Sequence, residues 1–346
     1  SKGPRPVPVH PAMPVSPART PRRLLGALAA GLVLTFGLAA CSGGAAPEAA
    51  SDTRVFSTDL GDVTVPTEIE RIVSVDFYTP GALMDVGVTP VGVVNTYFTD
   101  TEGDAIPTAY TTEIAASGAE SIGEYYELNV EAIAKANPDV IIATNDFLPM
   151  DAELRPQLEK IAPIVTFTAR DSLSWKTRAD AVAELLGKEA ELAPVKEEYE
   201  TRLAEVREAH RDFLDNNTIA IFVPSQEATW GTYAPTHFTG GVWSDLGAKY
   251  REQAEDEINE SGFPNWFSYE ELGRLENADV LLQQTAELPE EITSGNAIWE
   301  KLPAVQNNLV FPNIDRSPTG SYGWALENIN DIDALLTEID ARIASR

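Results

Sequence analysis

The feature that most constrains the fold is a long run of helical periodicity in the middle of the chain, residues 172–214. Apolar and aromatic side chains and one histidine recur there at spacings of three and four, so they line one face of a helix. They are Leu192, Val195, Tyr199, Leu203, Val206, His210 and Phe213. Gly187 is expected to end a first helix, and a second helix, bent at Pro194, is expected to continue unbroken to about Leu214. At 1.5 Å per residue this second helix would be about 35–40 Å long, enough to cross a small domain.

Short β-type runs lie on both sides of this helical stretch. A chain of 346 residues is long enough for two domains of ordinary size. The simplest organisation is two lobes, residues 55–171 and 215–346, joined by a helical strut at 172–214. The alternative is one large α/β domain with a long surface helix.

In the first lobe, β-type runs alternate with helical runs. Strands are expected at 71–75, 90–94, 140–144 and 164–167, and helices at 82–86, 128–136 and 154–162. This rhythm predicts βαβ units and a mostly parallel, doubly wound sheet. The alternation continues in the second lobe, with strands at 218–223 and 278–282 and a closing helix at 325–343. No sequence repeat between the two lobes is evident.

Ligands of doubly wound sheets bind beyond the carboxyl ends of the strands. Aromatic side chains and a few polar ones gather in the loops expected there. In the first lobe they are Tyr78, Tyr97, Phe98, Tyr125, Tyr126, Phe147 and Arg170, and in the second Trp230, Tyr233, His237, Arg316, Tyr322 and Trp324. One aromatic alone is more often a packing residue, but a group in loops after strands favours a ligand-binding cleft.

The amino terminus has the pattern of an export signal. Arg19, Arg22 and Arg23 precede an uncharged run at 24–40 that ends in small residues before Cys41. Leu-Ala-Ala-Cys at 38–41 resembles the bacterial lipobox, in which the cysteine carries a lipid. Residues 1–41 are thus expected to be a signal peptide with a lipobox, and residues 42–54 a flexible tether. The alternative is an uncleaved membrane anchor, for which 17 apolar residues are short.

Composition excludes several classes of function. Residues 41–346 contain 20 Lys and Arg against 54 Asp and Glu, a formal charge of −34, which repels nucleic-acid phosphates. The single cysteine rules out an intramolecular disulfide, and two histidines beyond the leader are too few for direct capture of zinc or manganese. No nucleophile elbow, phosphate-binding loop or Cys/His nucleophile pair is present, so nothing indicates an enzyme.

Several segments, taken in order, resemble a known family. RIVSVDFYTPGALMDVGVTPVGVVNTYF at 71–98, NVEAIAKANPDVII at 129–142 and the central helix are similar to the substrate-binding lipoproteins of ABC importers for ferric siderophores, haem and cobalamin. The resemblance covers roughly residues 55–340. It implies the class III periplasmic-binding-protein fold: two Rossmann-like α/β lobes joined by a single long rigid helix, with ligand held in a shallow cleft.

The resemblance also implies partners. In this family one glutamate on each lobe docks onto arginines of the permease, and the matching positions are Glu131 and Glu270, with Glu271 as the alternative register. For Glu131 and Glu270, a solvated carboxylate at a helix N-terminus, favoured by the helix dipole, is the alternative account. The implied function is capture of a ferric siderophore outside the cell, by a monomer anchored to the membrane through Cys41, and delivery to an ABC permease. Iron would be carried within the siderophore, with no cofactor bound directly.

The charge of the expected cleft indicates which kind of ferric siderophore it would bind. Ferric catecholates are strongly anionic, whereas ferric hydroxamates are neutral or nearly so. The expected cleft has many aromatic residues but only Arg170 and Arg316 as cations, which favours a hydroxamate or mixed ligand. Two alternatives remain open: the same fold binding haem, cobalamin or another large cofactor, and a lipid-anchored enzyme or adhesion module.

Overall fold

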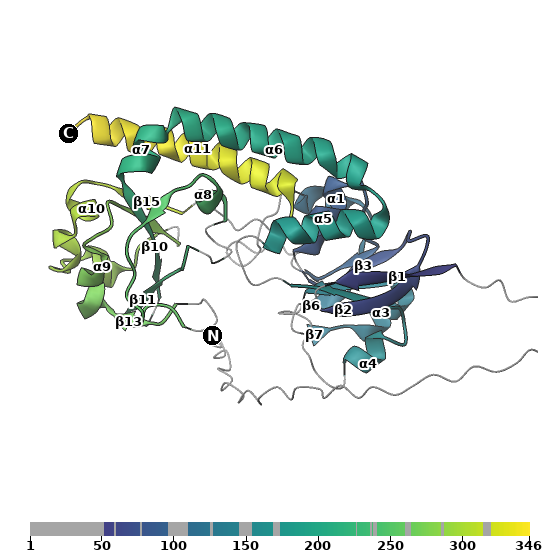
Figure 1. Cartoon of the computed structure of the whole chain (residues 1–346). Helices are drawn as coiled ribbons and strands as arrows, with labels where there is room; N and C mark the ends of the chain where they lie inside the picture. Colours follow the sequence, from purple (N-terminus) through teal and green to yellow (C-terminus); the bar gives the residue numbers. More distant parts are fainter. Residues whose placement is uncertain are drawn as a thin grey trace, which may run out of the picture. The chain divides into compact units, whose positions relative to one another are not determined.

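The computed structural model divides the chain into two units, Ser1–Ala50 and Ser51–Arg346. The structure describes residues 52–346 except 59, 77, 96–109, 125–126, 145–153, 169–173, 226, 236, 238–240, 260–263, 285–286 and 314–319. The expected signal peptide, the lipobox with Cys41 and most of the expected tether lie outside the described residues. Figure 1 shows the arrangement of the elements.

The first sheet is parallel and doubly wound, as the βαβ rhythm predicts. Its strands are β3 (Ile72–Ser74), β4 (Gly92–Val93), β5 (Glu120–Ser121), β8 (Val140–Thr144) and β9 (Ile164–Phe167). They lie in the order β5-β4-β3-β8-β9, and every neighbouring pair is parallel. The strand order reverses between β3 and β8, which is where doubly wound sheets bind ligands.

Short helices and two hairpins surround this sheet. The helices are α1 (Thr79–Asp85), α2 (Thr111–Ala116), α3 (Val130–Ala136) and α4 (Arg155–Leu158). The hairpins pair β1 (Thr53–Thr58) with β2 (Gly61–Pro66) and β6 (Gly123–Glu124) with β7 (Glu127–Leu128). Strand β1 thus begins at Thr53, inside the stretch expected to be the end of the tether.

The second sheet is mixed. Its strands are β10 (Thr218–Pro224), β11 (Thr229–Thr232), β12 (Lys249–Tyr250), β13 (Phe267–Ser268), β14 (Val280–Gln283) and β15 (Val310–Pro312). The order is β13-β11-β10-β14-β15, with β12 also paired to β10. Strands β10, β12, β14 and β15 are parallel, whereas β11 is antiparallel to both β10 and β13. Its helices are α8 (Gly241–Asp245), the 3₁₀ helices η3 (Tyr269–Leu275) and η4 (Trp299–Lys301), α9 (Glu290–Thr293), α10 (Pro303–Gln306) and α11 (Tyr322–Ala344).

The stretch that joins the two sheets contains three helices, α5 (Ser174–Leu186), α6 (Glu189–Ala209) and α7 (Arg211–Asn216). The predicted break at Gly187 is confirmed, with a left-handed backbone there (φ 63°). The prediction of an unbroken helix to Leu214 was wrong, because α6 ends at Ala209. The ring of His210 lies between two carboxylates of α11, Asp340 at 2.7 Å and Asp333 at 2.8 Å, a tertiary contact that helical periodicity does not reveal.

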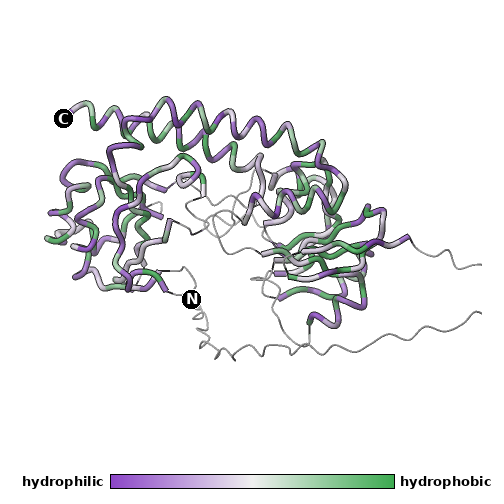
Figure 2. The backbone as a smooth tube through the Cα atoms, viewed as in Figure 1, coloured by the Kyte–Doolittle hydropathy of each residue, from purple (hydrophilic) through white to green (hydrophobic). Residues whose placement is uncertain are grey.

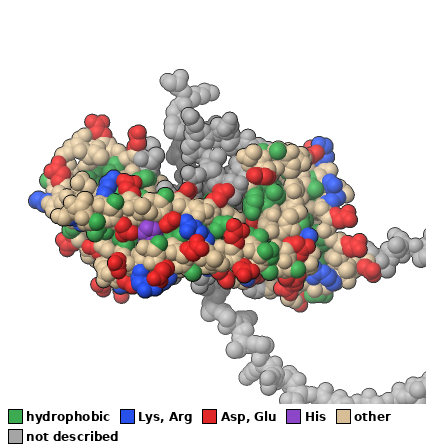
Figure 3. Space-filling view, turned by 90° about the horizontal axis from the view of Figure 1, so that it is seen from above, with side chains coloured by type: hydrophobic (Ala, Val, Ile, Leu, Met, Phe, Trp, Pro, Cys, Tyr) green, Lys and Arg blue, Asp and Glu red, His purple; other side chains and the backbone are tan. Residues whose placement is uncertain are grey.

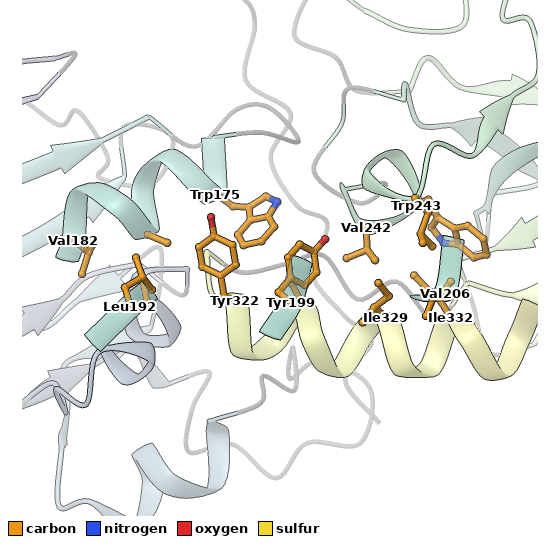
Figure 4. Packing of buried hydrophobic residues seen from close by; sticks show 14 of the residues in the cluster. Trp175, Val182, Leu192, Tyr199, Val206, Val242, Trp243, Tyr322, Ile329 and Ile332 are labelled. Carbon is orange, nitrogen blue, oxygen red and sulfur yellow. The ribbon is translucent and has the colours of Figure 1, made fainter. Parts of the chain in front are cut away.

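A continuous hydrophobic core runs through both halves along these helices. Helix α6 packs against α11, and the two lie side by side in Figure 1. In Figure 4 Trp175 of α5, Tyr199 of α6 and Tyr322 of α11 point toward one another, with ring centroids 4.9–5.8 Å apart. Figure 2 shows hydrophobic and hydrophilic stretches alternating along both long helices, as one buried face requires. The core therefore couples the helices of the first sheet to those of the second.

Candidate functional site

The loop that follows β3 is held by a buried carboxylate. Asp76 accepts hydrogen bonds from the backbone N–H groups of Tyr78 (2.8 Å) and Thr79 (2.7 Å) and from the Thr79 hydroxyl (2.9 Å). It thereby satisfies N–H groups at the start of α1. Burial raises the pKa of Asp76 above its ordinary value, although these hydrogen bonds and the Arg178 charge act the other way. The loop at the strand-order reversal is thus built around an acid.

Arg178 of α5 is a buried cation at the same edge of the sheet. Its guanidinium lies 5.3 Å from the ring centroid of Tyr78 and donates to the carbonyl of Thr168, which follows β9, at 3.2 Å. A Cβ atom at Gly320 would lie 2.8 Å from a guanidinium nitrogen, so the segment that leads into α11 passes directly over Arg178. The structure places Tyr78, a sequence-predicted site residue, against this arginine.

Arg178 was missed by the sequence analysis, although a signal was present. Trp175, Arg178, Ala179 and Val182 are all buried and follow helical spacing. An arginine on an apolar stripe must have compensating partners or a function, because burying an unpaired charge is unfavourable. A search for charged residues on predicted apolar faces would have found it.

In the second half, two predicted residues come together. The rings of Tyr233 and His237 are stacked, with centroids 4.1 Å apart. Burial lowers the pKa of His237 from 6.5 to about 4, so its imidazole is neutral near pH 7. The Tyr233 carbonyl accepts from the Gln253 side chain at 3.0 Å. This pair provides an aromatic surface without positive charge.

Three predicted site residues are not in loops. Trp230 lies in strand β11 with no exposed surface, packed between Phe222 and Phe267 at centroid distances of 6.0 and 5.6 Å. Tyr322 and Trp324 lie in the first turn of α11, with 3% and 2% of their surface exposed. The loop placement was wrong because Ser321 caps α11 one turn before the expected start, and because a loop and a short buried strand have similar local patterns. Their contact with ligand stays a prediction.

The remaining predicted ligand contacts lie outside the described residues. They are Tyr97, Phe98, Tyr125, Tyr126, Phe147, Arg170 and Arg316. Within the described ranges no cluster of three or more His, Cys, Asp or Glu side chains could hold a metal ion. No helix in those ranges is long and apolar enough to cross a membrane.

The two predicted docking glutamates occupy equivalent positions. Glu131 is the second residue of α3, and Glu270 is the second residue of η3. Both are exposed, and neither makes a hydrogen bond or ion pair within the described part of the chain. Glu271, by contrast, pairs with Arg274 at 3.2 Å. The structure therefore favours Glu270 over Glu271 as the counterpart of Glu131.

A short repeat underlies this equivalence. Asn137-Pro-Asp-Val140 precedes β8, and Asn277-Ala-Asp-Val280 precedes β14. Asp139 accepts from the backbone N–H of Arg71 at 2.8 Å, and Asp279 accepts from that of Thr218, also at 2.8 Å. Each aspartate thus ties the start of its strand to the parallel neighbour. The expectation of no repeat between the lobes was wrong, and the signal was the pair NPDVII and NADVLL.

Comparison with known proteins gives the family. A family model described as periplasmic binding protein matches residues 72–312, well over half of the chain. The chain belongs to the periplasmic binding protein family. Its fold is the class III α/β fold of that family, whose members bind substrates for transport.

Named relatives cover most of this periplasmic binding protein. YhfQ of Bacillus subtilis strain 168, which carries the name of an ABC transporter substrate-binding lipoprotein, is 25% identical over 323 residues, covering 89% of this chain and 94% of YhfQ. The Fe(3+)-citrate-binding protein YfmC of the same strain is 25% identical over 282 residues, covering 78% and 80%. The solved siderophore periplasmic binding protein from the fuscachelin gene cluster of Thermobifida fusca is 26% identical, with a TM-score of 0.59, covering 79% and 98%.

Proposed function

We propose that this protein captures a ferric siderophore outside the cytoplasm and delivers it to an ABC permease. The observation that carries the proposal is the family match over residues 72–312, together with relatives named for binding iron complexes. In such complexes iron is enclosed by the oxygens of the chelator. The protein then needs shape, aromatic surface and a few hydrogen-bond donors rather than metal ligands of its own.

The described part of the site supports a weakly charged ligand. The positive charge of Arg178 faces the buried acid Asp76, and His237 is neutral near pH 7. Two further donors, the Thr144 hydroxyl at the end of β8 and the Trp175 indole N–H, are buried and lack a hydrogen-bond partner among the described residues. Buried donors normally have an acceptor, so a ligand oxygen or a water is expected there. This combination supports a ferric hydroxamate or mixed siderophore.

The amino-terminal pattern and the lipoprotein name of a relative support membrane attachment. We infer that Cys41 carries the lipid and that residues 42–54 tether a monomeric binding unit to the membrane. Two lobes at 55–171 and 215–346, connected by 172–214, remain the proposed domain division. The surface over α6 and α11, seen in Figure 3, carries intermingled acidic and basic side chains rather than a basic patch.

Delivery requires contact with the permease, and Glu131 and Glu270 are the proposed contacts. They are exposed carboxylates at equivalent positions of the two halves, and neither is paired with another residue that the structure describes. In Figure 1 the β6–β7 hairpin and β13, which precede them, lie on the side of the sheets away from α6 and α11. A partner with two correspondingly placed cations would be complementary to both.

Tryptophan fluorescence during ligand titration tests the function. The panel contains a ferric hydroxamate, a ferric catecholate, ferric citrate, haem and cobalamin, with each iron-free chelator as the matched control. We expect saturable quenching by one ferric complex at sub-micromolar concentration and none by its iron-free form. Quenching only by haem or cobalamin would show that one of these, and not a ferric siderophore, is the ligand. No response to any member of the panel would reject the proposed function.

A further inference from the structure

Trp266 is an exposed tryptophan on the surface of the second half. In the described part of the chain three large hydrophobic side chains are strongly exposed, Val55, Leu60 and Trp266. Val55 and Leu60 belong to the β1–β2 hairpin, whereas Trp266 has 54% of its surface exposed immediately before β13. Strand β13 is the edge of its sheet, so nothing in the described fold covers that side. Single exposed apolar residues are common, and position must decide whether this one has a role.

Its position relative to the docking glutamate is informative. The N-cap positions of the helices that carry Glu131 and Glu270 are Asn129, whose side chain accepts from the Ala132 N–H, and Ser268, whose side chain makes no capping hydrogen bond. Counting two residues back from each cap reaches Glu127 in the first half and Trp266 in the second. In both halves the residue between, Leu128 or Phe267, is partly buried and packs on the core.

Burial alternates in the same way in both segments. Glu127, Asn129 and Glu131 are exposed in the first, as are Trp266, Ser268 and Glu270 in the second, while the residues between them are turned inward. Alternate residues of an extended segment share one face. Trp266 therefore shares a face with Ser268, just before the helix that carries Glu270, as Glu127 shares one with Asn129 just before the helix that carries Glu131. Both faces have a small polar residue at the second exposed position and a glutamate at the third, but at the first one has an acid and the other an indole.

We propose that Trp266 is an apolar anchor of the permease contact on the second half, so that the two docking faces bind unlike surfaces. The proposal rests on the proposed function, because the permease is its partner. Tryptophan is enriched among residues that dominate binding energy, especially where polar neighbours surround it. Ser268 and Glu270 supply such neighbours. The complementary partner surface has a cation for Glu270 and an apolar recess for the indole.

The chemistry of the face argues against the cargo as its occupant. Glu270 and Glu271 would repel an anionic ferric complex, and a neutral ferric complex, with its iron enclosed by chelator oxygens, offers no cation for a carboxylate to bind. Glu271 and Asp256 are engaged by Arg274, at 3.2 and 2.9 Å, so no unpaired cation offsets Glu270 there among the described residues. A protein surface with a basic residue satisfies both the carboxylate and the indole.

The test compares Trp266→Ala with Val55→Ala, an exposed apolar residue away from the docking faces. The full chain is bound to nanodiscs containing the permease–ATPase complex that the iron-loaded chain stimulates, and dissociation constants for the complex and for the ferric ligand are measured. Trp266→Ala should weaken permease binding about tenfold or more. Val55→Ala should leave it unchanged, and both should keep the ligand affinity of the parent chain. Trp266→Gln, which keeps a long side chain, should show the same loss if the alanine variant folds poorly.

The outcomes separate this inference from the proposed function. Unchanged permease binding by Trp266→Ala, alongside loss in the Glu131→Ala/Glu270→Ala double variant, would reject the anchor and leave the function standing. A loss of ligand affinity in Trp266→Ala would make Trp266 a cargo contact and overturn the inference. If the parent chain binds no ferric complex and stimulates no permease, the proposed function itself fails.

Discussion

The two halves of the molecule are alike where their central strands begin and unlike at the edges of their sheets. Asp139 and Asp279 make the same contact to a neighbouring strand, and each follows a short helix with an exposed glutamate. The first sheet is parallel throughout, whereas the second ends in the antiparallel strands β11 and β13. The shared part positions the glutamates, and the divergent edge places Trp266 where the first half has Glu127.

The halves also differ in how they respond to protons. In the first half, burial raises the pKa of Asp76 and of Asp85, so the folded state holds protons that the unfolded chain releases. In the second half, burial lowers the pKa of His237, so the folded state lacks a proton that the unfolded chain takes up. Lowering the pH therefore stabilises the folded state through Asp76 and Asp85 and destabilises it through His237.

The largest expected effect tests whether Trp230 belongs to the core of the second half. Trp230→Ala should reduce the free energy of unfolding by about 3–5 kcal/mol, because it empties a fully buried site between two aromatic rings. Urea unfolding measures the change, with the half-buried neighbour Tyr233→Ala as the milder control. A Trp230→Ala protein of normal stability that no longer binds ligand would instead support the ligand contact predicted from the sequence.

A substitution at the contact between α1 and the start of α11, which joins the two halves, should reduce the free energy of unfolding nearly as much. Asp85, at the end of α1, accepts from the Ser321 hydroxyl (2.9 Å) and from the N–H groups of Tyr322 (2.6 Å) and Gly323 (3.1 Å) at the start of α11. Asp85→Ala leaves these donors buried and unpaired, and should destabilise the fold by about 3 kcal/mol. Ser321→Ala removes only the hydroxyl and should lose about 1 kcal/mol. Equal losses in the two variants would show that the backbone donors at the start of α11 do not need Asp85.

The contribution of His237 to the pH dependence of stability can be measured separately from that of the two aspartates. Because its folded pKa is about 4 and its ordinary value is 6.5, its contribution to stability is complete above pH 6.5 and is lost as the pH falls toward 4. His237→Phe should therefore lose less stability than the parent chain between pH 7 and pH 5. Denaturant midpoints across that range measure this, and parallel curves for the two proteins would contradict it.

The smallest expected effect concerns Asp139 and Asp279, the equivalent aspartates of the short repeat. Asp139→Asn and Asp279→Asn each weaken hydrogen bonds to the neighbouring strand, and each should reduce the free energy of unfolding by about 1 kcal/mol. Chemical unfolding of both variants under the same conditions compares the two losses of free energy of unfolding. Strongly unequal losses would show that the two turns are alike in sequence but not in energetic role.

Local pattern was enough to predict much of this architecture. The alternation of apolar strands and helices predicts the parallel first sheet, and the stop at Gly187 and the closing helix follow from residue type and periodicity. The pairing of Glu131 with Glu270 came from the family resemblance, and its register against Glu271 needed the structure. Local pattern failed at Trp230, because a short buried strand and an aromatic loop look alike over four residues. It failed at His210 because the partners that bracket the ring lie more than 120 residues away.

The sequence by itself therefore determined the fold class, the helix break at Gly187 and the class of substrate-binding protein, since these depend on residue type, on periodicity and on motifs in order. Only the tertiary structure decided which charges are paired. Arg178 opposite Asp76, Asp85 at the start of α11 and His210 between Asp333 and Asp340 all depend on contacts between distant parts of the chain. A chain with 54 acidic residues offers a partner near every position in sequence, and folding alone selects which carboxylates are neutralised and which, such as Glu270, stay available for a partner.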